Sequence, residues 1–510
     1  MSDGALRYRL TGQHWTSREI AALQIGKDRW SYAQLIEMAE QRMAQLGRRG
    51  FSAGQLLLCP ASPVLESLLM QYAASRLGGA VLPIRADLSR VRRQQLLEAT
   101  GAEWLWQPLI PESTDGRFVR MSRARDEPTS RTASAANPAV LIETSGSQGP
   151  PKIVMLSAAN VFASCSAVNA RLELHESDAW LCALPRQHVG GLAIGYRCAL
   201  AGATMVVQEC FDPDRMHRTF RSHDITHVSL VPAMLHRLLE RGFAPPTSLR
   251  VVLMGGQALD PNLARRAVDR GWPLYLGYGM TETFTQIAGK WIGASGVPGT
   301  GLELLEGVEL DAPRCNRCDV PSGWVQQGPG ADRTKVSGAA AASSAAPRIA
   351  DAAMHRVPIR VRGPMLMLGY ANRERETGLG LENGWLQTND LGCLDPSGYL
   401  KVAGRADEAV VIAGINVLPA DVERRLVDLG GVDEVAVVGV PDEIWGHRLV
   451  AFFTGTLEPA NVERWCRHSL PSHLRPRGFA RVSRLPLLAS GKPDRKALAS
   501  RAAALTGNRV

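Results

Sequence analysis

The stretch from Thr144 to Lys152, TSGSQGPPK, combines hydroxyl side chains, glycines, prolines and one lysine. In such a glycine-rich turn, successive backbone N–H groups can point inward at an anion, and a lysine adds positive charge. The stretch is therefore a candidate phosphate-binding loop. It lacks the GxxxxGK(S/T) order of a P-loop, and a polar linker would have the same composition. Taken alone, the stretch leaves both interpretations open.

A second candidate is LGYGMTET, which directly follows the apolar run PLYL and so lies at the end of a predicted strand. Ligand sites in open α/β sheets lie outside the carboxyl ends of the strands. Here Tyr278 offers an aromatic face to a base, Thr281 offers a hydroxyl, and Glu282 offers a carboxylate of the kind that Mg²⁺ prefers. An ordinary turn with a helix cap is the alternative.

Three further stretches each carry a candidate side chain. Asp390 follows the strand-like run in WLQTNDLGCLD, where a carboxylate could hold both hydroxyls of a ribose. Arg405 opens the stretch RADEAVVIAGINVLPADVE, and Lys492 lies in the glycine–proline loop SGKPDRK. Two of them have a plain alternative, namely a turn aspartate for Asp390 and a solvated cation for Lys492.

The elements around these stretches alternate between strand and helix. Residues 30–50 have apolar side chains at helical spacing, and residues 55–63 form a short apolar run that predicts a buried strand. Residues 66–84 then predict a helix, a Gly-Gly stop and another strand. The same rhythm returns at AWLCALP, TMVVQE, THVSLVP and LRVVLMGG, which predicts a parallel sheet with helices on its faces.

The later part of the chain departs from this rhythm. Residues 312–356 are low in complexity and rich in turn residues, and we interpret them as a flexible insertion. Short strands with turns follow, as in a small β-rich subdomain. The predicted fold class is α/β. A large N-terminal domain of parallel-sheet α/β layers plus the β-rich subdomain spans residues 1–404, and a small α/β domain that carries Lys492 spans residues 405–510.

Composition excludes several classes of protein. The 510-residue chain is 45% hydrophobic and 21% charged, and it has no apolar run long enough for a membrane span. It shows no secretory signal, so we expect a cytoplasmic location and reduced cysteines. The net charge of +9 comes without a basic run that interleaves aromatics, so we expect no nucleic-acid partner. The Cys315–Cys318 pair lacks the second ligand pair that a zinc site needs.

Five motifs in a fixed order resemble the adenylate-forming superfamily of acyl-CoA synthetases, luciferases and adenylation domains. They are TSGSQGPPK, GYGMTET, TND, GRADEAVVIAGINVLPADVE and SGKPDRK, and the resemblance runs from Trp30 to Ala497. It implies a two-step reaction in which a carboxylate attacks the α-phosphate of ATP and a thiol, usually of coenzyme A, then displaces AMP. ATP, Mg²⁺ and coenzyme A are the implied small molecules.

The resemblance also assigns residues to roles. It places the leaving phosphates at Thr144, Ser145, Gly146, Ser147, Gly149 and Lys152, adenine at Gly255, Gly256, Gln257 and Tyr278, and the ribose at Asp390 and Arg405. It makes Lys492, Thr281 and Glu282 the catalytic set, with Glu282 holding Mg²⁺. Glu408 and Gly414 would lie at the hinge and the coenzyme A path. The chain departs from the family pattern at Gln148, Ile153, Asn389 and Glu408, which puts the rate in question more than the reaction type.

The stretch LPRQHVGGLAIGYRCALAGA bears on the identity of the acid. Its His-Val-Gly-Gly start and Arg197 resemble the o-succinylbenzoate–CoA ligases of menaquinone synthesis, in which the matching arginine lies near the second carboxylate of the substrate. The implied acyl site comprises His188, Gly190, Arg197 and Gly279. The alternative for Arg197 is an ion pair with a structural acid.

The sequence therefore predicts an ATP-dependent carboxylate–CoA ligase that acts on o-succinylbenzoate through an acyl-adenylate. A CoA ligase for another aromatic or aliphatic acid is one alternative. A non-catalytic relative that binds nucleotide or acyl-adenylate is another, although the retention of Glu282 and Lys492 argues against it. The oligomeric state stays open, with a homodimer or a higher homo-oligomer among the alternatives.

Overall fold

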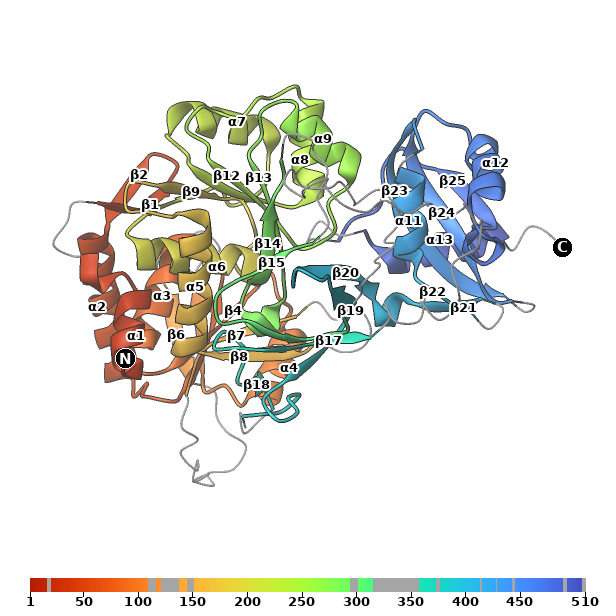
Figure 1. Cartoon of the computed structure of the whole chain (residues 1–510). Coiled ribbons are helices and arrows are strands. Elements are labelled where there is room, and N and C mark those ends of the chain that lie inside the picture. The colour runs from red at the N-terminus through yellow and green to blue at the C-terminus, as the bar shows by residue number, and fades with distance from the viewer. Residues whose placement is uncertain are drawn as a thin grey trace, which may run out of the picture.

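The computed structural model of the chain describes residues 1–15, 20–108, 116–120, 137–144, 151–293, 301–314, 357–372, 377–412, 415–427, 429–442, 445–488 and 493–506 (Figure 1). Six predicted site residues lie outside these ranges: Ser145, Gly146, Ser147, Gly149, Gly414 and Lys492. Most of the predicted insertion, residues 315–356, also lies outside them.

A nine-stranded sheet forms one layer of the larger part of the chain. Six neighbouring strands run parallel, and each of the three strands at the two edges pairs antiparallel with its inner neighbour. In spatial order the strands are β15 (Glu303–Leu304), β14 (Gln286–Trp291), β13 (Leu274–Gly279), β12 (Val251–Met254), β11 (His227–Leu230), β9 (Ala179–Cys182), β10 (Thr204–Val207), β1 (Ala21–Ile25) and β2 (Asp28–Ser31).

A seven-stranded sheet forms a second layer. Its four central strands, β7, β4, β3 and β5, are parallel. At the two edges, β8 pairs antiparallel with β7, β18 with β8, and β6 with β5. In spatial order the strands are β18 (Gly369–Tyr370), β8 (Ile153–Ser157), β7 (Pro138–Glu143), β4 (Ala80–Ile84), β3 (Leu56–Pro60), β5 (Trp104–Pro108) and β6 (Gly116–Arg120). The predicted strands at residues 55–63 and 80–84 are therefore confirmed.

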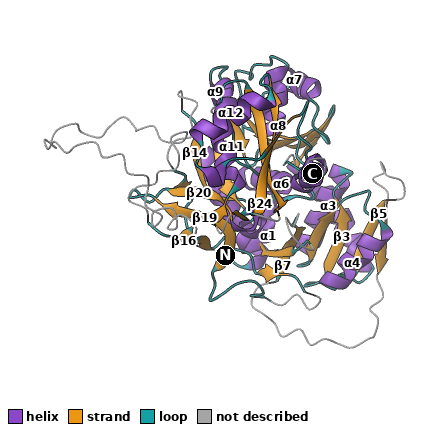
Figure 2. Ribbon diagram, turned by 90° about the vertical axis from the view of Figure 1, so that its right-hand side faces the viewer, coloured by secondary structure: helices purple, strands orange, loops and turns teal. Residues whose placement is uncertain are grey.

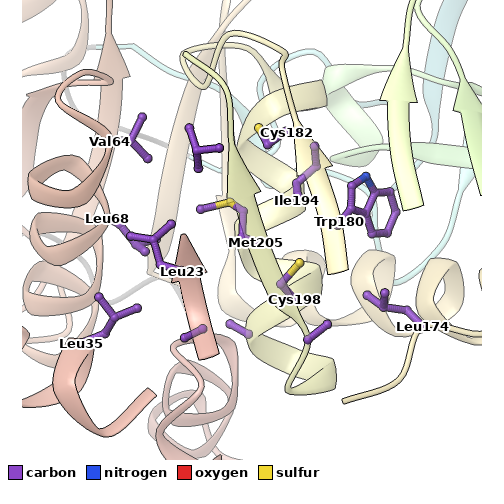
Figure 3. Close-up of a cluster of buried hydrophobic side chains, with 14 of the residues drawn as sticks. Leu23, Leu35, Val64, Leu68, Leu174, Trp180, Cys182, Ile194, Cys198 and Met205 are labelled. Carbon is purple, nitrogen blue, oxygen red and sulfur yellow. The ribbon is translucent and has the colours of Figure 1, made fainter. Parts of the chain in front are cut away.

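Three helices lie between the two sheets. Each contributes side chains to the core of both layers, which explains why they are apolar on more than one face. In α6 (Val189–Ala201), Ile194 and Cys198 pack toward the nine-stranded sheet, whereas Leu192 and Ala193 pack toward the seven-stranded sheet. The other two are α3 (Val64–Arg76) and α5 (Ala158–Leu172). Figure 3 shows the cluster around Trp180, Ile194, Cys198 and Met205.

The outer helices cover the remaining faces. On the nine-stranded sheet, successive residues of β12 point to opposite sides: Val251 and Leu253 join one core, and Val252 and Met254 join the other. The helices of the second core are α7 (Pro213–Ser222), α8 (Pro232–Glu240) and α9 (Pro261–Val268), each with proline in its first turn. The other outer helices are α1 (Asp3–Leu10), α2 (Tyr32–Arg48) and α4 (Arg90–Thr100), and η1 (Gln13–Trp15) follows α1.

Local sequence signals account for the predicted helix at residues 30–50. The Ser31 hydroxyl accepts the backbone N–H of Gln34, and the Gln34 side chain accepts the N–H of Ser31, which is a capping box. The buried side chains Leu35, Ile36 and Ala39 then give α2 one apolar face. The prediction is confirmed over Tyr32–Arg48.

The β-rich subdomain is a four-stranded antiparallel sheet, as the short strands and turns predicted. In spatial order its strands are β16 (Glu309–Asp311), β17 (Pro358–Arg362), β19 (Leu386–Leu394) and β20 (Leu400–Arg405). β20 ends at Arg405 and leads into η3 (Ala406–Glu408), so this sheet carries both Asp390 and Arg405.

The C-terminal part has its own cores around a three-stranded sheet (Figures 1 and 2). That sheet contains β23 (Val432–Asp442), β24 (Gly446–Gly455) and β25 (Gly478–Arg481). The remaining elements are the pair β21 (Val410–Ile412) and β22 (Ile415–Val417), the helices α11 (Pro419–Val427), α12 (Pro459–Ser469) and α13 (Arg495–Thr506), and η4 (Ser472–Leu474). The predicted α/β fold class, with a large first part and a small second one, is confirmed.

Two expectations from composition have different outcomes. Within the described ranges, no helix combines the length and the apolar character needed to cross a membrane. The expectation of reduced cysteines needs a correction. Cys59, Cys165, Cys182, Cys198, Cys210 and Cys466 are free, but Cys393 is disulfide-bonded.

Candidate active site

The glycine-rich stretch connects two antiparallel strands. It joins β7 to β8, and its two ends are bonded together: the Thr144 N–H donates to the Lys152 carbonyl at 2.8 Å, and the Lys152 N–H donates to the Thr144 hydroxyl at 3.2 Å. The Thr144 hydroxyl also donates to the Lys152 carbonyl. Thr144 therefore closes the base of the loop, and Lys152 is exposed at that base.

Two parallel strands end side by side near the predicted nucleotide residues. β12 leads into Gly255, Gly256 and Gln257, and its neighbour β13 ends at Tyr278 and Gly279. A Cβ at position 279 would lie 2.1 Å from the Thr285 carbonyl oxygen, so only glycine fits there. The packing of parallel strands thus brings two motifs that are distant in sequence to one edge of the sheet.

Tyr278, Asp390 and Arg405 lie together in the structure. The Tyr278 hydroxyl donates to Asp390 Oδ2 at 2.7 Å, and Arg405 Nη1 donates to Asp390 Oδ1 at 3.4 Å. The pairing of β19 with β20 places Asp390 directly opposite Arg405. Arg405 also makes two 2.9 Å bonds to Asp407. Both of its interactions are therefore with carboxylates of the chain.

The pKa values at this point follow from the contacts. Burial raises the pKa of Tyr278 well above its usual value, and the negative charge of Asp390 adds to the rise. The hydrogen bonds to Asp407 are the main reason why the pKa of Arg405 is raised. Tyr278 stays a hydrogen-bond donor and Arg405 stays charged.

Glu282 and Lys152 are linked through a residue that the sequence did not single out. Glu282 lies in η2 (Thr281–Thr283), directly after β13, and its Oε1 accepts the Tyr370 hydroxyl at 2.7 Å. The Lys152 ammonium lies over the ring of the same tyrosine, 4.5 Å from its centroid. The sequence pattern indicates only a strand at Tyr370, because its two partners are far away in the sequence.

The described residues could hold magnesium only together with phosphate groups of a bound substrate. Glu282 offers one carboxylate, and the described part of the chain contains no cluster of three or more His, Cys, Asp or Glu side chains that could cage an ion. Mg²⁺ is commonly held by one or two carboxylates together with substrate phosphates, so the donor set fits.

The predicted acyl residues come from α6 and β13. His188 is the N-cap residue of α6, Gly190 is exposed in its first turn, and Arg197 lies two turns further along. Arg197 Nη2 donates to Gln286 Oε1 at 3.0 Å, and Gln286 is paired with Gly279 across β13 and β14. Gln286 thereby connects Arg197 to the strand end that carries Gly279.

Arg197 is almost fully buried. Its side chain is 2% exposed, its guanidinium lies 5.3 Å from the centroid of the Trp180 ring, and its Nε has no hydrogen-bond partner. Among the residues that the structure describes, no carboxylate forms a salt bridge with it. Burial lowers its pKa to about 10. The alternative of a structural acid therefore finds no support in these ranges.

Glu408, which the resemblance predicts to lie at the hinge, contacts the segment that follows Lys492. Arg495 Nε lies 3.6 Å from Glu408 Oε1, and its two terminal nitrogens bond Glu423 at 2.8 and 3.1 Å. Burial raises the pKa of the Glu408 carboxyl. Arg495 was missed from the sequence because an arginine in the first turn of a helix has many ordinary explanations.

Comparison with known proteins identifies the family. Residues 13–371 match the AMP-binding enzyme family, and residues 421–492 match the AMP-binding enzyme C-terminal domain. The chain belongs to this family. The predicted adenylate-forming superfamily is thus confirmed over most of the sequence.

The family relatives include o-succinylbenzoate enzymes. The chain is 27% identical to the 2-succinylbenzoate–CoA ligase of Bacillus pumilus, over 96% of each chain. It is similar to the o-succinylbenzoate CoA synthetase of Bacillus subtilis in complex with its acyl-adenylate intermediate, with a TM-score of 0.74, 25% identity, and coverage of 96% of this chain and 97% of that one. The Bacillus subtilis enzyme in complex with ATP and a magnesium ion has the same TM-score and identity, with coverage of 96% and 99%. These comparisons confirm the resemblance to the o-succinylbenzoate–CoA ligases.

Proposed function

We propose that this AMP-binding enzyme is an ATP-dependent carboxylate–CoA ligase that converts o-succinylbenzoate to its coenzyme A ester through an acyl-adenylate. The observation that carries the choice of acid is the buried Arg197, which has no carboxylate partner among the described residues. A buried charge without a counter-ion is costly unless a ligand supplies one. A dicarboxylic acid keeps one carboxylate free for activation and offers the other to Arg197.

The proposed nucleotide site uses the residues at the ends of β12, β13 and β19. Gly255, Gly256 and Gln257 surround the adenine, Tyr278 contacts it, and Asp390 with Arg405 holds the ribose hydroxyls. Because the Tyr278 hydroxyl and Arg405 both bond Asp390, that carboxylate is fixed before ATP arrives. Such preorganisation reduces the entropy cost of binding.

The proposed phosphate site lies between the glycine-rich loop and η2. Lys152 and the loop residues Ser145, Gly146, Ser147 and Gly149 hold the leaving phosphates, with Thr144 at the base, and Thr281 contacts the α-phosphate. Glu282 holds Mg²⁺, which would neutralise charge on the phosphate oxygens. An ionised carboxylate needs no general base, so the chain has to supply position and positive charge. Lys492 supplies that charge in the first step.

In the second step we propose a rotation of the C-terminal part, residues 405–510, that removes Lys492 and opens the coenzyme A path past Gly414. The Arg495–Glu408 contact connects the lysine-bearing segment to the hinge, so both would move together. A cytoplasmic location remains part of the proposal, and the oligomeric state stays open.

The test is pyrophosphate release with ATP and Mg²⁺ across a panel of acids, with and without coenzyme A. The panel holds o-succinylbenzoate, benzoates, fatty acids and amino acids. We expect release with o-succinylbenzoate and formation of its coenzyme A ester. If pyrophosphate is released with a different acid and not with o-succinylbenzoate, that acid is the substrate. ATP binding without pyrophosphate release for any acid would favour a non-catalytic relative.

A half-reaction assay separates the two steps. Lys492→Ala should abolish adenylate formation and leave coenzyme A transfer from supplied acyl-adenylate largely intact. Equal loss in both half-reactions would contradict the role proposed for Lys492.

A further inference from the structure

Tyr370 lies between two groups of opposite charge that are proposed to face the triphosphate of ATP. Its hydroxyl donates to Glu282 Oε1 at 2.7 Å, and the Lys152 ammonium lies 4.5 Å from the centroid of its ring. The two contacts use different parts of one side chain. The hydroxyl bonds the carboxylate, while the face of the ring attracts the cation.

The backbone around Tyr370 is tied to both partners. Tyr370 is paired with Val154 of β8, and the Ala371 N–H donates to the Ile153 carbonyl at 2.7 Å, next to Lys152. On the other side, the Met367 N–H donates to the Glu282 carbonyl at 2.8 Å. The short segment 367–371 therefore bridges the strand that begins after Lys152 and the turn that carries Glu282.

Gly380 leaves the space that the tyrosine ring occupies. It has a φ of +86°, and a Cβ there would lie 2.4 Å from the Tyr370 ring. The Tyr370 N–H also donates to the Leu379 carbonyl at 2.8 Å. The ring is thus held from one side by a glycine turn while its other contacts face Lys152 and Glu282.

We propose that Tyr370 is a positioning residue that sets the spacing of Lys152 and Glu282 across the triphosphate. The ring orders the long lysine side chain before ATP binds, which lowers the entropy that binding must remove. The hydroxyl fixes one oxygen of Glu282, so the carboxylate would hold the metal ion from one fixed orientation. This role rests on the proposed function only in that ATP with Mg²⁺ occupies the site.

Two substitutions separate the two contacts. Tyr370→Phe keeps the ring and removes the bond to Glu282, whereas Tyr370→Leu removes both. Affinity for ATP is measured by titration calorimetry with and without Mg²⁺. For Tyr370→Phe we expect about tenfold weaker binding with Mg²⁺ and a change of less than about twofold without it. For Tyr370→Leu we expect binding about three- to fivefold weaker even without Mg²⁺.

Two controls keep the test decisive if Tyr370→Leu does not fold. Tyr399→Phe removes a hydroxyl from an exposed tyrosine and should leave both affinities unchanged. In a Glu282→Gln background, Tyr370→Phe should lose most of its effect on binding with Mg²⁺. An undiminished effect there, or equal weakening by Tyr370→Phe with and without Mg²⁺, would overturn the proposal.

The readout is ATP binding, so the outcome does not depend on the acid. An enzyme that binds ATP with Mg²⁺ but activates no acid would contradict the proposed function and leave the role of Tyr370 standing. An active o-succinylbenzoate ligase in which Tyr370→Phe binds ATP like the wild type would contradict the role of Tyr370 alone.

Discussion

Arg197 and Arg405 both lie at proposed ligand sites, yet their surroundings are opposite. Arg405 is partly exposed and bonds Asp390 and Asp407, and these acids raise its pKa. Arg197 is buried against Trp180 and Gln286, and burial lowers its pKa to about 10. An arginine whose counter-ions belong to the chain can hold a carboxylate in the orientation in which it accepts hydrogen bonds from neutral hydroxyl groups. An arginine without them has its charge available for an anionic ligand.

The largest effect should come from Arg197→Met, which keeps much of the aliphatic stem and removes the charge. We expect kcat/KM for o-succinylbenzoate to fall by about 100- to 1000-fold, because losing one partner of a buried charge pair costs about 3–4 kcal/mol. For 4-oxo-4-phenylbutanoate, which lacks the ring carboxylate, the change should stay within about threefold. Pyrophosphate release measures both values.

Arg186→Met is the matched control. Arg186 is also buried, and it bonds the Val64 carbonyl and the Gln71 side chain. Its substitution should leave the ratio of the kcat/KM values for the two acids unchanged, even if both values fall. A similar loss of kcat/KM for both acids in Arg197→Met would contradict the proposed contact with the second carboxylate.

A smaller effect should follow from Asp390→Asn, which removes the negative charge at the proposed ribose site. We expect KM for ATP to rise by about 10- to 50-fold, equally with every acid, because the ribose loses its charged acceptor. ATP and 2′,3′-dideoxy-ATP are compared in the same assay. If the variant still discriminates between them as the wild type does, Asp390 does not hold the ribose.

Tyr278→Phe should have an effect of about fivefold on KM for ATP, because Asp390 keeps its contact with Arg405. The raised pKa of Tyr278 means that the phenol is protonated at every pH below its usual value of about 10 and loses its proton only well above it. The ratio of variant to wild-type KM should therefore stay flat from pH 7 to 9.5. A ratio that falls toward one across this range would show that Tyr278 titrates there.

The smallest effects should appear in thermal unfolding without ligands. Arg405→Met should lower Tm by about 1–2 °C, since two carboxylates lose a partly exposed partner. Arg197→Met should not lower Tm by more than this, because methionine removes a buried charge that no carboxylate of the described residues pairs with. A larger drop for Arg197→Met than for Arg405→Met would indicate that Arg197 is a structural cation.

The sequence predicted the features that depend on local order. Alternating apolar runs indicated the layered α/β fold, and the five ordered motifs indicated Tyr278, Asp390 and Arg405, which the structure brings together. It could not predict contacts made across the fold. Tyr370 contacts Lys152 and Glu282 only because β18 pairs with β8, and nothing near Tyr370 in the sequence signals this.

The surroundings of Arg197 also depend on packing. Whether it pairs with an acid is decided by the position of α6 against β9 and β14, which supply Trp180 and Gln286. The motif LPRQHVGG could therefore indicate the arginine, but not that the described part of the chain places no carboxylate against it. The roles of Ser145 to Gly149, Gly414 and Lys492 stay predictions, because these residues lie outside the described ranges.

The most direct test of the central claim is the preference of the wild-type enzyme between two acids that differ in one carboxylate. The measurement is kcat/KM for pyrophosphate release with o-succinylbenzoate and with 4-oxo-4-phenylbutanoate. If Arg197 binds the second carboxylate of the substrate, o-succinylbenzoate should be preferred by about 1000-fold or more. The monoacid has no ring carboxylate and would leave the buried charge of Arg197 unpaired. Equal kcat/KM values for the two acids would contradict the account.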